Sequence, residues 1–212
     1  DIHKAIYYFS MAAKQGNSEA LFNLGVIFSK KYYNFYDINK AIHFYSKSAK
    51  KNHTIAQFNL GLLYMKIDIN KSLYYLNLSS KQNYSDSNFN LGILYMNGEF
   101  VKKDLNKAIY YFTLAANQNH SKSQFNLGYI YFYGIEVPKD INRGIYFYTL
   151  SSDQNEMVAQ EELGSIFSSK EYGKYDLNKS FHYYNLAAKQ NSAEALYNIG
   201  KFYQEGKLFK QD

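Results

Sequence analysis

Two short phrases recur along this chain of 212 residues at the same spacing. The first, Asp-Ile/Leu-x-Lys/Arg, begins at Asp1, Asp37, Asp68, Asp104, Asp140 and Asp176. The second, Asn-Leu-Gly or a close variant of it, ends at Gly25, Gly61, Gly92, Gly128, Gly164 and Gly200. Both phrases advance by 36 residues at every complete step except one, where both advance by 31. Two independent markers that share one period indicate an array of repeats.

A period between about 20 and 50 residues is typical of a solenoid, in which each repeat buries its apolar face against its neighbours. We therefore expect a single array over residues 1–212, with units that start near residues 1, 37, 68, 104, 140 and 176. Asp212 would open a seventh copy, and Asp1 begins in the middle of a unit. The chain is thus expected to be a fragment of a longer array.

The first phrase is predicted to open a helix. Over residues 37–51, small and apolar side chains recur at the spacing of one helical stripe. The Asp37 carboxylate can accept hydrogen bonds from the free amides of the first turn, where the helix dipole also favours negative charge. This helix is expected to end at Asn52, a position that only Gly or Asn occupies in the other copies: Gly16, Asn83, Asn119, Asn155 and Asn191. Both residues tolerate the left-handed backbone that closes a helix.

The second phrase lies in a second predicted helix, over residues 18–29. Its core face is expected to consist of Ala20, Leu21, Leu24, Ile27 and Phe28. Gly25 lies near the edge of that face, where the lack of a side chain lets the partner helix approach closely. The 31-residue unit loses its five residues between Tyr64 and Asp68, where the other copies carry loops. Since loops absorb length changes and packed helices do not, this deletion supports the assignment.

Composition excludes several classes of function. The chain has no cysteine, which removes catalytic thiols, cysteine-containing zinc sites and disulfides. Its net charge of +6 is spread over dispersed lysines with acidic residues between them, so we expect no nucleic-acid partner. No apolar run has the roughly 18 to 20 residues that a membrane span needs, and no signal-peptide pattern opens the chain. We expect no membrane insertion.

No residue set predicts catalysis, a cofactor or a metal site. The five histidines are His3, His43, His53, His120 and His182. His43 and His182 share a repeat position with Tyr7, Tyr74, Tyr110 and Tyr146, and His53 and His120 share another with Asn17, Tyr84, Glu156 and Ser192. A functional histidine would differ sharply from its copies and have converging partners. Most of the 24 tyrosines also recur at fixed positions, and we expect those positions to be core.

One pattern resembles a known family. The segments Ala-Leu-Phe-Asn-Leu-Gly-Val-Ile-Phe at 20–28 and Asp-Ile-Asn-Lys-Ala-Ile-His-Phe-Tyr-Ser-Lys-Ser-Ala at 37–49 are similar to the Sel-1-like repeat, a branch of the tetratricopeptide superfamily. The resemblance covers essentially the whole chain, although loop glycines survive only at Gly98, Gly134, Gly173 and Gly206. It implies an all-α, right-handed solenoid of antiparallel helix pairs, with a concave face lined by the first helix of each pair. Such proteins typically act as adaptors.

The candidate binding surface is the side of this first helix that faces away from the core. Its apolar pairs are Phe22 and Val26, Phe58 and Leu62, Phe89 and Ile93, and Phe125 and Tyr129. In the last two copies the pairs become polar, with Glu161 and Ser165 and then Tyr197 and Lys201. We expect the four phenylalanines to line a concave groove for apolar side chains of a peptide. In the competing interpretation, they pack against the next repeat.

An asparagine row runs beside these phenylalanines, at Asn23, Asn59, Asn90, Asn126 and Asn198. A side-chain amide can donate to a carbonyl and accept from an amide, so the row could hold the backbone of a peptide. The alternative is that each asparagine satisfies a local backbone group. Glu162 interrupts the row, and its charge could select a basic group.

The sequence therefore predicts a non-catalytic scaffold that binds a protein or peptide on its concave face, with no evident small-molecule substrate. Two alternatives stay open. The array is the substrate-selecting arm of a larger enzyme, such as a protein kinase with fused repeats, or it is an adaptor in a ubiquitin-ligase complex of endoplasmic-reticulum-associated degradation. The expected compartment is the cytoplasm. The endoplasmic reticulum alternative requires a signal or anchor elsewhere and glycans at the sequons of Asn52, Asn70, Asn77, Asn83, Asn119 and Asn178.

Overall fold

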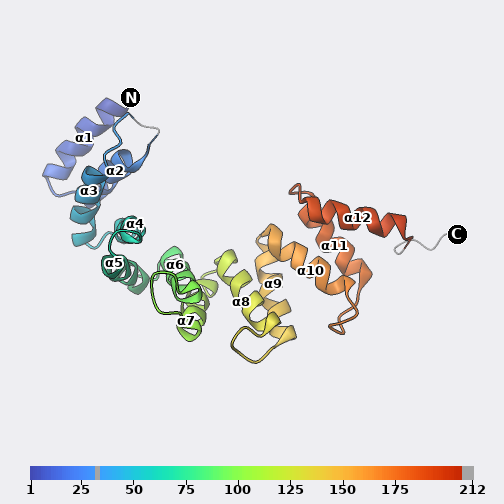
Figure 1. Cartoon of the computed structure of the whole chain (residues 1–212). Helices are drawn as coiled ribbons and strands as arrows, with labels where there is room; N and C mark the ends of the chain where they lie inside the picture. The colour runs from blue at the N-terminus through green and yellow to red at the C-terminus, as the bar shows by residue number, and fades with distance from the viewer. Residues whose placement is uncertain (32–33, 207–212) are drawn as a thin grey trace. The chain divides into compact units, whose positions relative to one another are not determined.

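The computed structural model describes residues 1–31 and 34–206, and Asp212 lies outside them. The described residues form twelve α-helices and no strand (Figure 1). The helices are α1 Ile2–Lys14, α2 Ser18–Ser29, α3 Ile38–Lys50, α4 Thr54–Tyr64, α5 Ile69–Lys81, α6 Ser85–Asn97, α7 Leu105–Ala116, α8 Ser121–Tyr133, α9 Ile141–Asp153, α10 Met157–Ser168, α11 Leu177–Ala188 and α12 Ala193–Gln204. None of these helices is long and apolar enough to span a membrane. The predicted all-α repeat fold is confirmed.

The chain divides into two compact units, residues 1–114 and 115–212. In the first unit, α1 to α5 each pack against the next helix along the chain, up to α6. The second unit repeats this arrangement from α8 to α12. Each unit is therefore a run of successive helix pairs, as the sequence predicts.

The conserved spacing of aspartates has a direct structural cause. The Asp37 carboxylate accepts a hydrogen bond from the backbone amide of Lys40 at 3.0 Å, so it caps α3 as predicted. The same bond forms in the other copies, to Lys4, Lys71, Lys107, Arg143 and Lys179. The backbone amide of Lys40 also holds the pKa of the Asp37 carboxyl below its usual range. Each aspartate thus fixes where a helix begins.

The predicted left-handed helix ends are also confirmed. Asn52 has a φ of 63°, and Gly16 has a φ of 85°. The remaining equivalents have φ angles from 57° to 65°: Asn83, Asn119, Asn155 and Asn191. This conformation is costly for most residues, which explains why only Gly and Asn occupy the position.

The predicted core and the close helix approach are confirmed in the first full pair. All five predicted core residues of α2 are buried. A Cβ atom at Gly25 would lie 2.5 Å from the ring of Tyr45 on α3, closer than any side chain tolerates. In the next copies the same approach brings Gly61 against Leu76 and Gly92 against Phe112. Glycine is required here because a large side chain of the following helix occupies the space.

The 31-residue copy keeps the backbone hydrogen bond of its capping aspartate although its loop is shorter. In the 36-residue copies, the amide of the capping aspartate donates to a carbonyl near the end of the preceding helix, as Asp37 does to Phe28 at 2.9 Å. In the 31-residue copy, Asp68 donates to the equivalent carbonyl of Tyr64 at 2.8 Å. The five missing residues therefore come from the loop alone, as predicted.

Buried glutamines, which the sequence analysis did not single out, tie neighbouring repeats together. In the first unit, Gln82 donates to the side chain of buried Gln57 at 2.7 Å, and Gln57 donates to the carbonyl of Ala49. In the second unit, Gln190 donates to buried Gln160 at 2.9 Å. These bonds satisfy buried amides, which would otherwise destabilise the fold.

Candidate functional site

The four phenylalanines of the candidate surface pack against the next repeat on one side and remain partly exposed on the other. The Phe22 ring stacks on His53 with 4.7 Å between centroids, and Phe58 meets Tyr84 edge-on at 5.2 Å. Phe89 lies 6.1 Å from Phe112, and Phe125 lies 5.5 Å from Tyr148. We call these four rings, together with Val26, Leu62, Ile93 and Tyr129, the phenylalanine face, of which Phe125 and Tyr129 belong to the second unit and the others to the first. Leu62 and Tyr129 are its most exposed members, at 39% and 42%.

The asparagine row forms local contacts with its own helices. The Asn90 side chain donates to the carbonyl of Asp86 at 2.8 Å, Asn126 donates to Lys122 at 2.7 Å, and Asn198 donates to Glu194 at 3.0 Å. Asn23 and Asn59 are half-buried on α2 and α4. Where the amide nitrogen donates one N–H in this way, the side chain can still offer its second N–H and its carbonyl oxygen to a partner.

A pocket opens between consecutive repeats on this face of the first unit. Its volume is about 290 Å³. Its lining includes Val26, Ser29, Tyr45, Asn59 and Leu62, three of which belong to the predicted site, and we call it the Tyr45 pocket. The hydroxyls of Ser29 and Tyr45 are hydrogen-bonded at 3.2 Å. Burial raises the pKa of Tyr45, and hydrogen bonding by Ser29 and Asn59 partly opposes this shift.

An equivalent pocket occurs in the second unit, at the same positions within the repeat. Its volume is about 190 Å³, and its lining includes Ser168, Tyr184, Asn198, Lys201 and Phe202. We call it the Tyr184 pocket. Serine, tyrosine and asparagine recur in the same roles, whereas Lys201 replaces the aliphatic Leu62 of the first unit. The repeat therefore builds similar cavities with different rims.

A third copy of these positions, also in the second unit, carries different side chains. Phe132 stands in the place of Ser29, Tyr148 in that of Tyr45, and Glu162 in that of Asn59. The Tyr133 hydroxyl donates to the Glu162 carboxylate at 3.1 Å. Burial raises the pKa of Glu162, the Tyr133 hydrogen bond lowers it, and the negative charges of Glu194 and Glu161 raise it further. Of the predicted site residues, Tyr129 lies beside Tyr133, with 5.0 Å between the ring centroids.

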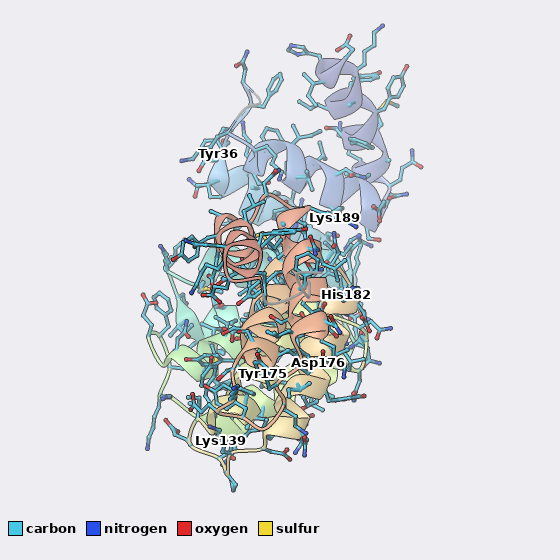
Figure 2. All side chains as sticks on the ribbon, turned by 90° about the vertical axis from the view of Figure 1, so that its right-hand side faces the viewer. Tyr36, Lys139, Tyr175, Asp176, His182 and Lys189 are labelled. Atoms are coloured by element: carbon cyan, nitrogen blue, oxygen red, sulfur yellow. The ribbon has the colours of Figure 1, made fainter. Side chains whose placement is uncertain are left out.

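The histidines have structural surroundings. The Nδ1 atom of His53 accepts from the amide of Ala56, and His120 accepts from Ser123 in the same way, so both cap the starts of helices. His43 on α3 and His182 on α11 are exposed, and Figure 2 labels His182 on its helix. Within residues 1–31 and 34–206, no three histidines or acidic residues are grouped so as to hold a metal ion.

The expectation that recurrent tyrosines belong to the core is wrong for one position. Tyr7, Tyr74 and Tyr110 in the first unit, and Tyr146 in the second, are each about 60% exposed. The exposure of this position could have been predicted from the sequence, because it lies two residues, or about 200° around a helix, from the buried position of Ala41. The histidines at the same position in two copies point to solvent for the same reason.

Comparisons with known proteins agree with this architecture. The Sel1 repeat family model matches seven times, over residues 1–17, 18–53, 54–84, 85–120, 121–156, 158–192 and 193–212. These boundaries start each unit at the helix that carries Asn-Leu-Gly, half a unit away from the aspartate starts. No curated protein matches the chain.

Several solved structures are similar. A Sel1 repeat protein from Oxalobacter formigenes is 29% identical with a TM-score of 0.80, over 92% of this chain and 82% of that one. The protective antigen c5321 of uropathogenic Escherichia coli is 24% identical with a TM-score of 0.80, over 94% and 44%. An immunity protein, Pa5087 from Pseudomonas aeruginosa, is 18% identical with a TM-score of 0.55, over 90% and 75%, and shares the fold alone. With the family model matched along nearly the whole length, this chain belongs to the Sel1 repeat family.

Proposed function

We propose that this chain is a non-catalytic scaffold that binds a protein or peptide partner through the phenylalanine face, which the family resemblance predicts to be concave. Sel1 repeat proteins generally mediate protein–protein interactions and are typically non-catalytic helical scaffolds. The specific part of the proposal is the face and the way in which it holds its partner.

The observation that carries the proposal is the pocket that recurs between consecutive repeats. Pockets for drug-sized ligands usually measure about 300–1,000 Å³. The Tyr45 and Tyr184 pockets, at about 290 and 190 Å³, are smaller and suit single amino-acid side chains. One such cavity in each unit, the first of them beside partly exposed phenylalanines, fits side chains of an extended partner segment better than one compact metabolite.

The chemistry of the Tyr45 pocket favours an apolar side chain. Val26 and Leu62 form an aliphatic rim, and Leu62 is 39% exposed. The hydroxyls of Ser29 and Tyr45 already bond to each other, so an apolar side chain in the pocket leaves neither hydroxyl without a hydrogen-bond partner. At the edge, the side chain of Asn59 is placed to bond the backbone of a partner segment. Phe22 and Phe58, held against the next repeat, keep the pocket walls in position.

The proposal places this interaction in the cytoplasm, and the six sequons provide the check. Asn52, Asn83 and Asn119 are exposed at helix ends, where a glycan would meet little hindrance. Mass spectrometry of native protein is expected to find all six unmodified. Glycans at these asparagines would place the chain in the secretory pathway instead.

The test is a selection from a displayed peptide library, followed by affinity measurement with the wild-type chain. We expect the selected peptides to bind Leu62→Lys at least tenfold more weakly, because the substitution places a charge at the apolar rim of the Tyr45 pocket. Ile67→Lys is the matched control, since Ile67 is 68% exposed and does not line the pocket. Circular dichroism checks that both variants fold. Equal affinity for the two variants, or no enriched peptide, would contradict the proposal.

A further inference from the structure

Two buried hydroxyls in the second unit, those of Tyr148 and Ser152, have no hydrogen-bond partner among the described residues. Tyr148 is fully buried, and its Oη atom is unpaired. A buried hydroxyl without a partner is costly, so native proteins seldom keep one without a reason. Burial raises the pKa of Tyr148, and the negative charge of Glu162 raises it further.

The other copies show what is missing. Ser29 bonds the hydroxyl of Tyr45 in the first unit, and Ser168 bonds that of Tyr184 in the second. At the same position beside Tyr148 stands Phe132, whose ring centroid lies 6.1 Å from that of Tyr148 and which offers no polar atom. The serine that satisfies the tyrosine in two copies is therefore absent in the third.

The Glu162 carboxylate lacks a positive partner among the described residues. Glu162 is half-buried, whereas the other copies carry a neutral asparagine at its position. None of the groups that shift the pKa of Glu162 is a base, and two of them, Glu194 and Glu161, are acids. Lys139 lies over the rings of Tyr172 and Phe132 instead. The negative charge of Glu162 is thus balanced by a hydrogen bond from Tyr133 and by no described cation.

We propose that Glu162, Tyr133 and Tyr129, together the Glu162 site, bind the ammonium or guanidinium group of a lysine or arginine of the protein partner. The N–H groups of such a cation would donate to the Glu162 carboxylate, and its positive charge would offset the half-buried negative charge. The rings of Tyr129 and Tyr133 are 42% and 43% exposed and lie side by side, and Tyr133 bonds the carboxylate, so a cation bound there would be attracted to a ring face. This inference rests on the proposed function, because it specifies one side chain of the partner.

An organic cation fits these groups better than a metal ion. Divalent metal ions in proteins are usually held by several carboxylate, imidazole or thiolate ligands. The Glu162 site offers one carboxylate and neutral phenols, and the described residues contain no cluster of three acidic or histidine side chains that could hold a metal. Directional N–H donors between aromatic rings match this set.

The test uses the full chain with ¹³C-labelled tyrosine rings, titrated by NMR with ethylguanidinium and with the neutral near-isostere N-ethylurea at constant ionic strength. We expect saturable shifts of the Tyr133 and Tyr129 signals with ethylguanidinium and at least tenfold weaker binding of N-ethylurea. Glu162→Gln keeps an acceptor for Tyr133 but removes the charge, and it should abolish the response. Glu99→Gln removes the same charge from an exposed loop of the first unit and should leave the response unchanged.

Two outcomes overturn the inference: equal responses to the two probes, or a full response in Glu162→Gln. If the glutamine variant does not fold, the same titration is made with Glu162→Asn, which carries the residue of the other copies and should also show no response. Failure here is separable from failure of the proposed function. Suppose that the selected peptides depend on Leu62 but carry no basic residue, and that the chain does not respond to ethylguanidinium. The proposal for the phenylalanine face would then stand, and only the proposal for the Glu162 site would be rejected.

Discussion

The Tyr45 pocket of the first unit and the Glu162 site of the second are built from the same helix positions, yet they differ in side chains and in charge. The difference begins at the end of the preceding helix. In the first unit, α2 ends at Ser29, and Lys30 continues as extended chain. In the second, α8 continues to Tyr133 and is closed by Gly134 in the left-handed conformation, with a φ of 70°. The longer helix places Tyr133 where its hydroxyl reaches Glu162.

This comparison shows how an array of similar backbones acquires different binding properties. The helix pairing, the capping aspartates and the close glycine contact are common to both regions. What differs is the loop glycine, the residue beside the buried tyrosine and the residue of the asparagine row. Phe132 is itself buried in the core, so at this position the variation changes the packing as well as the site.

The largest expected effect tests what the two regions share. Gly25→Ala and Gly128→Ala would each place a methyl group within 2.7 Å of the ring of Tyr45 or Tyr148. We expect each to lower the free energy of unfolding by about 1–3 kcal/mol, the usual cost of overpacking. Urea unfolding followed by circular dichroism measures this.

Gly200→Ala is the matched control, because Gly200 holds the same repeat position and a Cβ there would meet no described atom within 4 Å. It should be neutral or raise the free energy of unfolding by up to about 1 kcal/mol, as expected for alanine in place of a helical glycine. If all three variants behave alike, the close approach is not what the glycines provide.

A smaller effect, with opposite outcomes, tests what the two regions do not share. Tyr45→Phe removes a hydroxyl that is bonded to Ser29, so we expect a loss of about 1 kcal/mol. Tyr148→Phe removes a buried hydroxyl that has no partner, so the free energy of unfolding should stay constant or rise. The measurement is urea unfolding of both variants beside the wild type. Equal losses would mean that Tyr148 finds a partner in solution and would remove the contrast.

Most of the backbone was predictable because its signals are local and repeated. The capping aspartates, the left-handed Gly and Asn positions and the five-residue deletion each follow from the conformation of a few neighbouring residues, and all are confirmed. The loop glycines, noted in the sequence as incomplete, proved to be the point at which copies diverge: Gly98 and Gly134 close longer helices, whereas Lys30 and Ser169 do not.

The site was less predictable, because it depends on contacts between repeats. The sequence indicated that Glu162 breaks a row of asparagines, but nothing local links it to Tyr133, which lies 29 residues earlier. The phenylalanine column was expected either in a groove or in the packing between repeats. The rings do pack against the next repeat, which only the three-dimensional register of two helices reveals, and the groove stays a proposal.

The smallest expected effect concerns the charge of Glu162 and its dependence on pH. Burial raises the native pKa of this carboxyl above its ordinary value of 4.5, so between the two values the native state binds more protons than the unfolded state. The free energy of unfolding therefore falls as the pH rises through this window. Glu162→Gln has no carboxyl here, so its stability should lack this dependence on pH. We expect its Tm to match that of the wild type near pH 4 and to be about 1–3 °C higher near pH 7.

The control for this prediction is Glu99→Gln, whose Tm should follow that of the wild type at both pH values, since Glu99 is exposed in the other unit. The opposite sign would be informative. A wild type that gains stability over Glu162→Gln as the pH rises would have a native pKa below the ordinary value, because the Tyr133 hydrogen bond or a cation of the chain itself outweighs burial. In that case the carboxylate would already be stabilised, and the Glu162 site would no longer differ from the Tyr45 pocket by an unmet charge. If the free energy of unfolding falls with rising pH as expected, the second unit keeps a destabilising carboxylate where the other copies have asparagine. Such a cost is expected at a site whose carboxylate is paired only when a basic partner binds.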